Sequence, residues 1–451
     1  MNPSEVLQSA LRDASVTREV VLQPGAVAAL PGLVQRCLPK ARWLVVADQH
    51  TWAAAGQAAH EALAARDLAA DPLVLPAQPR LKPRAETAQQ IAGWLREAGA
   101  VPVAAGSGVI NDLVKHAAAL AGRPYVCVAT AASMDGYAAS GAALLQDGFK
   151  RTLACPPPVA IVADPEVLAA APPRMAGWGY GDLAGKIVAG ADWVLADALG
   201  VEPIHRAPFE LVQGHLGSWL GAPERLAARD PQALAGLLEG LLASGFAMQA
   251  HGNSRPASGS DHQFSHLWEM ENLQVAGEPA AHGACVGVGC VAMLALYEWW
   301  LAQPAEAFAA VRVRDYDDAA QLSTEIRAAL GDGEVAAAAH AEMHSKRAIG
   351  SRVARVRTLT ALWPQLRASL AGRLAGAGEM QRRLVLLGAP AHPRELGLDV
   401  QQLARDYRRA RLIRRRYTLL DALEDLGWLD RAVAELCAPG GFWGEPAQPQ
   451  P

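Results

Sequence analysis

The sequence has no dense cysteine framework, because only six cysteines occur among 451 residues and none of them forms a CxxC pair. Neither a disulfide-stapled fold nor a CxxC zinc module therefore organises the chain, and we expect reduced thiols. Positive charge is not in excess either: 41 Lys and Arg residues face 45 Asp and Glu residues, for a formal net charge of −4. Without a general attraction for polyanions, we expect no nucleic-acid partner.

Targeting and membrane-spanning segments are also missing. The stretch up to Leu22 lacks the basic and apolar regions of a secretory signal, and the charges of Glu5 and Arg12 interrupt it early. The most apolar run, Cys285–Leu301, is shorter than the roughly 20 residues that span a bilayer, and it carries Glu298. We therefore expect a cytoplasmic protein with no membrane partner and a buried helix over Cys285–Leu301.

What remains is a globular composition, with 51% hydrophobic and 19% charged residues. In the first third of the chain, short apolar runs alternate with alanine-rich helical stretches, which is typical of a parallel sheet in an α/β domain. Beyond about residue 175 the pattern is amphipathic and helical. The expected strands cover residues 18–22, 42–47, 72–75, 101–104, 125–128 and 159–162, and the first expected helices cover 51–66, 85–98 and 109–121. We predict an α/β domain over residues 1–173, an all-α domain over 174–437 and a flexible Pro/Gly-rich tail over 438–451.

A glycine-rich turn, Gly106–Gly108, follows the expected strand at residues 101–104. Glycines before a helix let the backbone approach a ligand, and the free N–H groups of the first helical turn favour a phosphate. The third glycine of a G-x-G-x-x-G fingerprint falls on Asn111, so an ordinary strand-to-helix turn is the alternative. Asp48 ends an earlier strand, where a carboxylate either binds a ribose and favours NAD over NADP or caps the next helix.

Three of the twelve histidines lie in unusual surroundings. His262 and His266 are spaced i, i+4 and share one helix face, and His282 opens the next apolar helix. Asp182 lies near the start of another apolar helix, where an uncovered charge needs a partner. One carboxylate and two imidazoles with an open coordination position are typical of a catalytic site for Zn²⁺ or another first-row divalent cation. Each histidine taken alone is more often a packed core residue.

These segments together resemble a known family. The motifs of sn-glycerol-1-phosphate dehydrogenases are matched, in chain order, by GSGVINDLVKH, ATAASMDGYAASGA, GYGDLAGK, GNSRPASGSDHQFSHLWEM and AHGACVGVG. That family belongs to the superfamily of dehydroquinate synthase and the metal-containing alcohol dehydrogenases. The resemblance implies a dehydroquinate synthase-like fold: a Rossmann-like NAD(P) domain, a helical metal-binding domain and a site in the cleft between them.

The resemblance also implies roles for individual residues. It makes Asp182, His262 and His282 the metal ligands and His266 a proton-relay residue. The predicted catalytic residues are His266 and Asp135; the predicted cofactor-binding residues are Asp48, Gly106, Ser107, Gly108, Asp112, Thr130 and Ser133; the predicted substrate-binding residues are Asp135, Lys186 and Arg255. Arg255 is a candidate for binding the substrate phosphate, with a loop-fixing ion pair as the alternative, and Lys186 either assists the phosphate or balances Asp182. Asp261 stands where the bacterial branch commonly has glutamate.

The expected function is the interconversion of dihydroxyacetone phosphate and sn-glycerol 1-phosphate with NAD(P)H, NAD being favoured, and with one divalent metal: Zn²⁺, Ni²⁺ or Fe²⁺. Alternatives are a polyol or alcohol dehydrogenase, or a dehydroquinate synthase-like enzyme. We expect a homodimer, from the resemblance and from the paired Trp299 and Trp300. The arginine-rich segment Arg405–Arg416 is interpreted as a solvated or interface-forming helix, with a face for nucleic acid or an acidic partner as the alternative.

Overall fold

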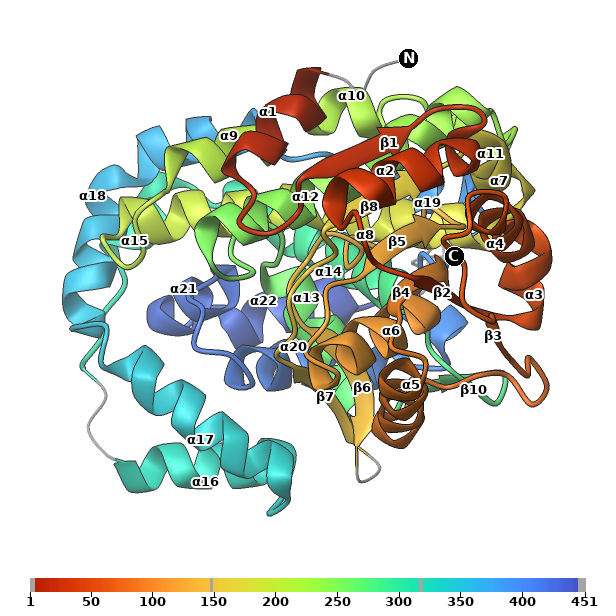
Figure 1. Ribbon diagram of the computed structural model, residues 1–451. Coiled ribbons are helices and arrows are strands. Elements are labelled where there is room, and N and C mark those ends of the chain that lie inside the picture. Colours follow the sequence, from red (N-terminus) through yellow and green to blue (C-terminus); the bar gives the residue numbers. More distant parts are fainter. Residues whose placement is uncertain (1–4, 147–148, 316–318, 445–451) are drawn as a thin grey trace. The chain divides into compact units, whose positions relative to one another are not determined.

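The structure is a computed structural model that describes residues 5–146, 149–315 and 319–444 (Figure 1). The chain divides into two compact units. Unit 1 consists of Met1–Leu183, Ala207–Ala257 and Leu386–Gly388, and unit 2 consists of Ala184–Arg206, Ser258–Val385 and Ala389–Pro451. The units interleave along the chain, whereas the predicted domains are consecutive, so the boundaries at residues 173 and 437 stay a prediction.

A six-stranded sheet forms the centre of unit 1. In spatial order its strands are β1 (Glu19–Leu22), β8 (Ala160–Ala163), β5 (Val126–Ala129), β4 (Val101–Gly106), β2 (Trp43–Asp48) and β3 (Leu73–Leu75). All neighbouring strands are parallel. Every residue of β4, β5 and β8 is buried, which explains why these strands are continuous apolar runs rather than alternating ones. The six expected strands are confirmed.

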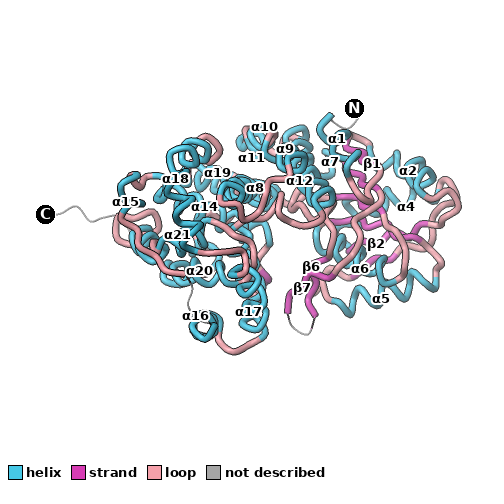
Figure 2. Tube along the Cα trace, turned by 90° about the vertical axis from the view of Figure 1, so that its left-hand side faces the viewer, coloured by secondary structure: helices cyan, strands magenta, loops and turns pink. Residues whose placement is uncertain are grey.

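Helices cover this sheet from both sides (Figure 2). On one side, alternate residues of the strands pack with η1 (Ala26–Ala29), α2 (Leu30–Cys37) and α4 (Gln57–Ala64). On the other side lie α5 (Ala85–Glu97) and α6 (Gly108–Leu120). The helix expected over residues 51–66 is present in three pieces, because a π-helical turn, η2 (Trp52–Gly56), separates α3 (Gln49–Thr51) from α4.

Unit 1 contains further elements beside the sheet. An antiparallel hairpin that the sequence did not predict joins β6 (Ala142–Gln146) to β7 (Phe149–Leu153). The remaining helices of unit 1 are α1 (Glu5–Asp13), α7 (Pro165–Ala170), the first part of α8 (Pro173–Ala198), α9 (Arg206–Gln213), α10 (Leu216–Leu220), α11 (Pro223–Ala227) and α12 (Pro231–His251).

Unit 2 is helical, as predicted, apart from a two-residue ladder between β9 (Gln274–Val275) and β10 (Glu278–Pro279). Its helices are the rest of α8, α13 (Ser260–Met270), α14 (His282–Leu301), α15 (Ala305–Ala309), α16 (Ala319–Leu330), α17 (Glu334–Arg347), α18 (Arg352–Ala371), α19 (Ala377–Leu386), η3 (Pro393–Leu396), α20 (Val400–Leu412), α21 (Leu419–Leu426) and α22 (Leu429–Cys437).

Two helices, α12 and α14, are long and apolar enough to cross a membrane, but 67% and 83% of their apolar windows are buried inside the structure. Such burial is typical of core helices in soluble proteins. The buried helix expected over Cys285–Leu301 is confirmed, since α14 is buried from Gly283 to Tyr297.

The prediction of a flexible tail over residues 438–451 is wrong for its first part. Trp443 is only 2% exposed, and its Nε1 donates to the hydroxyl of Tyr407 at 3.1 Å. Because a large aromatic side chain gains more from burial than a short chain end loses in entropy, this segment packs onto unit 2. Residues 445–451 lie outside the described part of the chain.

Candidate metal centre

Asp182 is fully buried on α8. The boundary between the two units falls directly after Leu183, inside this single continuous helix. The carboxylate accepts a hydrogen bond from the backbone N–H of Asp135, at 2.9 Å. A glycine at position 179 is required here, because a Cβ would overlap the carbonyl of Ala132.

The two predicted histidine ligands lie on α13 and α14. The start of α13 is fixed by the buried Asp192, whose Oδ2 accepts from both the backbone N–H and the hydroxyl of Ser260, each at 2.7 Å. His262 follows in the first turn of α13, and His282 is the first residue of α14. The ring centres of the two histidines are 5.5 Å apart.

Carboxylates on α13 orient both rings. Nδ1 of His262 lies 2.5 Å from Oδ2 of Asp261, and Nδ1 of His282 lies 2.6 Å from Oε1 of Glu269. Ser265 adds a contact to Nδ1 of His282 at 3.2 Å. A carboxylate at Nδ1 fixes the tautomer and leaves Nε2 as the available lone pair, an arrangement that commonly supports metal-binding histidines.

One ligand atom from each of Asp182, His262 and His282 lies within 4.8 Å of the others. A single cation can therefore bridge the three side chains. One carboxylate oxygen and two imidazole nitrogens are donors that suit Zn²⁺, Ni²⁺ and Fe²⁺, and three protein ligands leave a coordination position open. The residues present fit a catalytic divalent metal.

Asp135 lies in the loop after β5, next to the glycine-rich turn in unit 1. The backbone N–H of Thr130 donates to the carbonyl of Gly106 at 3.2 Å, and Oδ2 of Asp135 accepts from the hydroxyl of Ser244 at 3.2 Å. The loop thus starts at the carboxyl end of β5, beside that of β4, where ligands of open α/β sheets bind, and reaches the carboxylate of Asp182.

Lys115 of α6 holds this loop from behind. Its fully buried ammonium donates to the carbonyls of Gly136, Ala139 and Gly141 at 2.8, 2.8 and 3.0 Å. Burial lowers the pKa of Lys115, and the carboxylate of Asp112 opposes that effect. This residue carries no signal in the sequence beyond its place on an apolar helix, and sequence reasoning missed it.

The glycine-rich turn has the predicted geometry. α6 begins at Gly108, directly after β4, and Ser107 makes no side-chain cap to its N-terminus. A Cβ at position 106 would lie 2.5 Å from Cβ of Ile110, and one at position 108 would lie 3.1 Å from Sδ of Met134. The glycines therefore let the backbone lie close to Ile110 and Met134. The first N–H groups of α6 have no side-chain cap.

The other predicted cofactor-binding residues also lie in unit 1. Asp48 caps α3, where Oδ1 accepts from the N–H of Thr51 at 2.8 Å, so its helix-capping alternative is realised. Asp112 lies on α6, 3.9 Å from the ammonium of Lys115. Ser133 is buried, and its hydroxyl lies 3.5 Å from that of Tyr137. The ribose- and cofactor-binding roles of these residues stay predictions.

The predicted substrate residues Lys186 and Arg255 are both fully buried. Lys186 lies on α8, one turn after Asp182. The backbone N–H of Arg255 donates to Oδ1 of Asn253 at 2.8 Å, within the turn that precedes α13. Their contacts with a substrate stay predictions.

His266 lies on α13, with its ring centre 6.1 Å from that of His262 and 6.2 Å from that of His282. A group that sequence reasoning missed approaches it: Nη2 of Arg414 lies 2.6 Å from Nδ1 of His266. Burial, followed by the charge of Arg414, holds the pKa of His266 well below its ordinary value. The neutral ring, accepting at Nδ1, carries its proton on Nε2.

The arginines of α20 are largely neutralised within unit 2. Arg408 pairs with Asp430 at 2.5 Å, and Arg409 pairs with Asp406 at 2.7 Å. Arg409 also pairs with Glu271, and Arg411 with Glu325. A cavity of about 900 Å³ borders these residues and is separate from the candidate metal ligands. The pairing agrees with a structural role for this helix.

The fold and this donor set resemble those of a class of enzymes, the metal-dependent alcohol dehydrogenases. A family model described as iron-containing alcohol dehydrogenase matches residues 21–172. A probable glycerol dehydrogenase from Sinorhizobium meliloti has the same fold, with a TM-score of 0.58 at 17% identity over 93% of this chain and 98% of that chain. The predicted fold class is confirmed.

Curated relatives identify the family within this class of enzymes. Glycerol-1-phosphate dehydrogenase [NAD(P)+] from Halalkalibacterium halodurans is 35% identical over 56% of this chain and 64% of its own length. The enzyme of that name from Bacillus velezensis is 35% identical over 58% of this chain and 68% of its own length. The chain belongs to the glycerol-1-phosphate dehydrogenase family, and it aligns with about two thirds of the length of these two relatives.

Proposed function

We propose that this protein interconverts dihydroxyacetone phosphate and sn-glycerol 1-phosphate with NAD(H) or NADP(H) and a divalent metal held by Asp182, His262 and His282. The observation that carries the proposal is the convergence of these three ligand atoms within 4.8 Å, with Asp135 bonded to Asp182. The two relatives named above support the substrate.

Bound at these residues, the metal would polarise the substrate carbonyl, and a reduced nicotinamide would supply the hydride. The chain's own contribution is orientation. Asp261 and Glu269 hold the two imidazoles with Nε2 available, and the backbone N–H of Asp135 orients the carboxylate of Asp182.

His266 orients the developing alkoxide in this proposal. With Nδ1 accepting from Arg414, its Nε2–H donates a hydrogen bond toward that oxygen during ketone reduction. A bound water supplies the proton, and in the direction of alcohol oxidation water takes it up. Asp135 contacts the substrate or the nicotinamide through its side chain, which Ser244 holds.

The dinucleotide binds in this proposal along the carboxyl ends of β4 and β5. The N–H groups at the start of α6 receive the pyrophosphate beside Gly106, Ser107 and Gly108, and Thr130 and Ser133 line the nicotinamide. Oδ1 of Asp48 caps α3, and in this proposal the negative charge of the same carboxylate also favours NAD over NADP, since it repels a 2′-phosphate.

The metal is Zn²⁺, Ni²⁺ or Fe²⁺ in this proposal, and the protein is a cytoplasmic homodimer. Size-exclusion chromatography with light scattering tests the dimer. The metal content of protein purified without added ions, measured by mass spectrometry, distinguishes the three metals.

The substrate is tested by following NADH oxidation with dihydroxyacetone phosphate and with dihydroxyacetone, which lacks the phosphate. We expect a much higher kcat/KM for the phosphorylated ketone, and a product of sn-1 configuration by enantioselective chromatography. Equal rates with both ketones, or formation of sn-glycerol 3-phosphate, would contradict the proposal.

A further inference from the structure

An arginine remote in the sequence reaches the candidate metal centre. Arg414 lies in the loop between α20 and α21, and its Nη2 donates to Nδ1 of His266 at 2.6 Å. The ring of His266 lies about 6 Å from the rings of His262 and His282. The guanidinium is therefore separated from both candidate ligands by a single imidazole.

The charge of Arg414 is not neutralised by an ion pair among the described residues. Its side chain is exposed overall; partial desolvation lowers its pKa, while the carboxylates of Glu342 and Glu269 raise it. In contrast, Arg408, Arg409 and Arg411 all pair with carboxylates. A guanidinium has five N–H donors. One of them donates to the neutral ring of His266, so the others are available to bind an anion.

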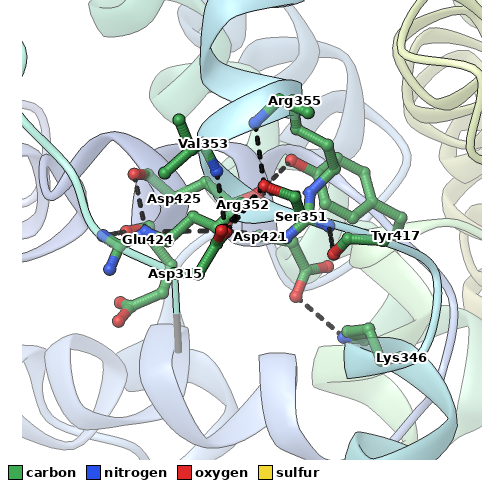
Figure 3. A network of polar contacts seen from close by, with 12 residues as sticks. Asp315, Lys346, Ser351, Arg352, Val353, Arg355, Tyr417, Asp421, Glu424 and Asp425 are labelled. Atoms are coloured by element: carbon green, nitrogen blue, oxygen red, sulfur yellow. Dashed lines mark hydrogen bonds and ion pairs between the residues drawn. The ribbon is translucent and has the colours of Figure 1, made fainter. Parts of the chain in front are cut away.

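A network of polar contacts holds α21, the helix that follows the loop carrying Arg414 (Figure 3). The hydroxyl of Tyr417 donates to Oδ2 of Asp425 at 2.8 Å, and Nε of Arg355 donates to the same oxygen at 2.7 Å. The buried ammonium of Lys346 donates to Oδ1 of Asp421 at 2.9 Å. These bonds fix the start of α21 and, with it, the end of the loop.

Further bonds hold the loop against the helices around it. The backbone N–H of Arg415 donates to Oε2 of Glu342 at 2.6 Å, and Nε2 of Gln263 donates to the carbonyl of Arg416 at 3.4 Å. Gln263 directly follows His262, so the helix that carries this candidate ligand also holds the loop. A group fixed in this way loses little entropy when it binds a ligand.

We propose that Arg414 binds the anionic phosphate of the substrate and so sets the preference for a phosphorylated ketone. A planar guanidinium binds phosphate oxygens in a bidentate manner. The substrate is short, with a single CH₂–O link between its carbonyl carbon and its phosphate, so a cation that binds the phosphate must lie close to the metal. Arg414 meets that condition by its contact with His266. The inference rests on the proposed function, because it takes the metal centre as the place of reaction.

The test compares Arg414→Met and Arg414→Lys with the wild-type holoenzyme. For Arg414→Met, kcat/KM falls with both ketones because His266 loses its partner, and the fall with dihydroxyacetone phosphate is roughly 10- to 100-fold larger, as expected for the additional loss of a charged hydrogen bond to the phosphate. Arg414→Lys retains part of the preference, since it keeps the charge without the fork. Arg415→Met is the matched control, because the bond of Arg415 to Glu342 uses its backbone N–H, and it leaves both values unchanged.

Inhibition by inorganic phosphate gives a measurement independent of the carbonyl substrate. Arg414→Met raises the inhibition constant of phosphate about 10-fold or more if the inference holds. An unchanged constant, or an equal fall of kcat/KM with both ketones, would overturn it, since the latter indicates that Arg414 acts only through His266. A selective loss in Arg255→Met but not in Arg414→Met assigns the phosphate to Arg255 instead. Wild-type protein that does not favour the phosphorylated ketone contradicts the proposed function, while the phosphate inhibition still decides the role of Arg414.

Discussion

Two histidines on neighbouring helices are oriented by carboxylates from one helix, α13. The contacts at 2.5 and 2.6 Å join groups that are partly or fully shielded from water, where such charged contacts are strong. Removing either carboxylate frees the ring to rotate and makes its nitrogen a weaker donor to a metal.

For Glu269→Gln we expect a 10- to 100-fold loss of metal affinity, roughly the effect of removing such an orienting group. The measurement is competition with a chromophoric chelator, which needs no activity assay. Glu271→Gln is the matched control, because Glu271 lies on the same segment and pairs with Arg409 rather than with a histidine. If both variants bind the metal as tightly as the wild type, the Glu269 contact does not orient His282 for metal binding.

For Lys115→Met we expect a less stable protein with a poorly formed site. One buried and two part-buried carbonyls would lose the ammonium donor, at a cost of up to about 1–3 kcal/mol for the buried one. The free energy of unfolding is measured in urea, and KM for NADH and for the ketone is measured in parallel. If the variant unfolds at the same urea concentration as the wild type and has the same KM values, Lys115 neither stabilises the protein nor shapes the site.

Part of the candidate site could be predicted from the sequence, because the residues concerned lie close together in the chain. The i, i+4 spacing of His262 and His266 and an acid on an apolar helix are visible in the chain. Glu269 lies seven residues after His262 on the same helix face, a signal that an ordinary amphipathic helix also gives. Arg414 lies 148 residues from His266, so only the folded chain brings the two together.

At the scale of elements, α13 and α14 cross closely because small residues separate them. A Cβ at Gly289 of α14 would lie 2.5 Å from the backbone oxygen of Asp261, and a Cβ at Gly185 of α8 would overlap the carboxylate of Asp261. The helices that carry the candidate ligands thus leave room for Asp261 at their crossing.

Gly289→Ala should destabilise the protein by about 1–3 kcal/mol, the usual cost of overpacking, and weaken metal binding by displacing Asp261. Thermal and urea unfolding measure the first effect, and chelator competition measures the second. Gly236→Ala on α12 is the control, because a Cβ there meets nothing within 4 Å, and it should be neutral or stabilise by up to about 1 kcal/mol. A Gly289→Ala protein as stable as Gly236→Ala would contradict the close crossing.

The sequence predicted the parallel sheet well, because strands buried on both faces leave continuous apolar runs such as Val101–Gly106. It did not predict the hairpin of β6 and β7, whose strands mix polar and apolar residues without clear alternation. Nor did it predict that residues 207–257 belong with the sheet, since helical periodicity says which face is buried but not against which neighbour.

At the scale of the whole molecule, the metal should link the helices into one cooperative structure. Binding to the native state alone stabilises it by about 2.7 kcal/mol at a free metal concentration of 100 times Kd. We expect the melting temperature of metal-free protein to rise on adding Zn²⁺, Ni²⁺ or Fe²⁺, and Asp182→Asn to lose most of that rise. A rise of equal size in the variant would place the stabilising metal elsewhere.

The most direct test of the account is a crystal structure of the metal-loaded protein with anomalous diffraction recorded at the absorption edge of the bound metal. The account predicts one strong anomalous peak bonded to a carboxylate oxygen of Asp182 and to Nε2 of both His262 and His282. An empty site between these side chains in protein that is fully active, or a peak held by other residues, would contradict it.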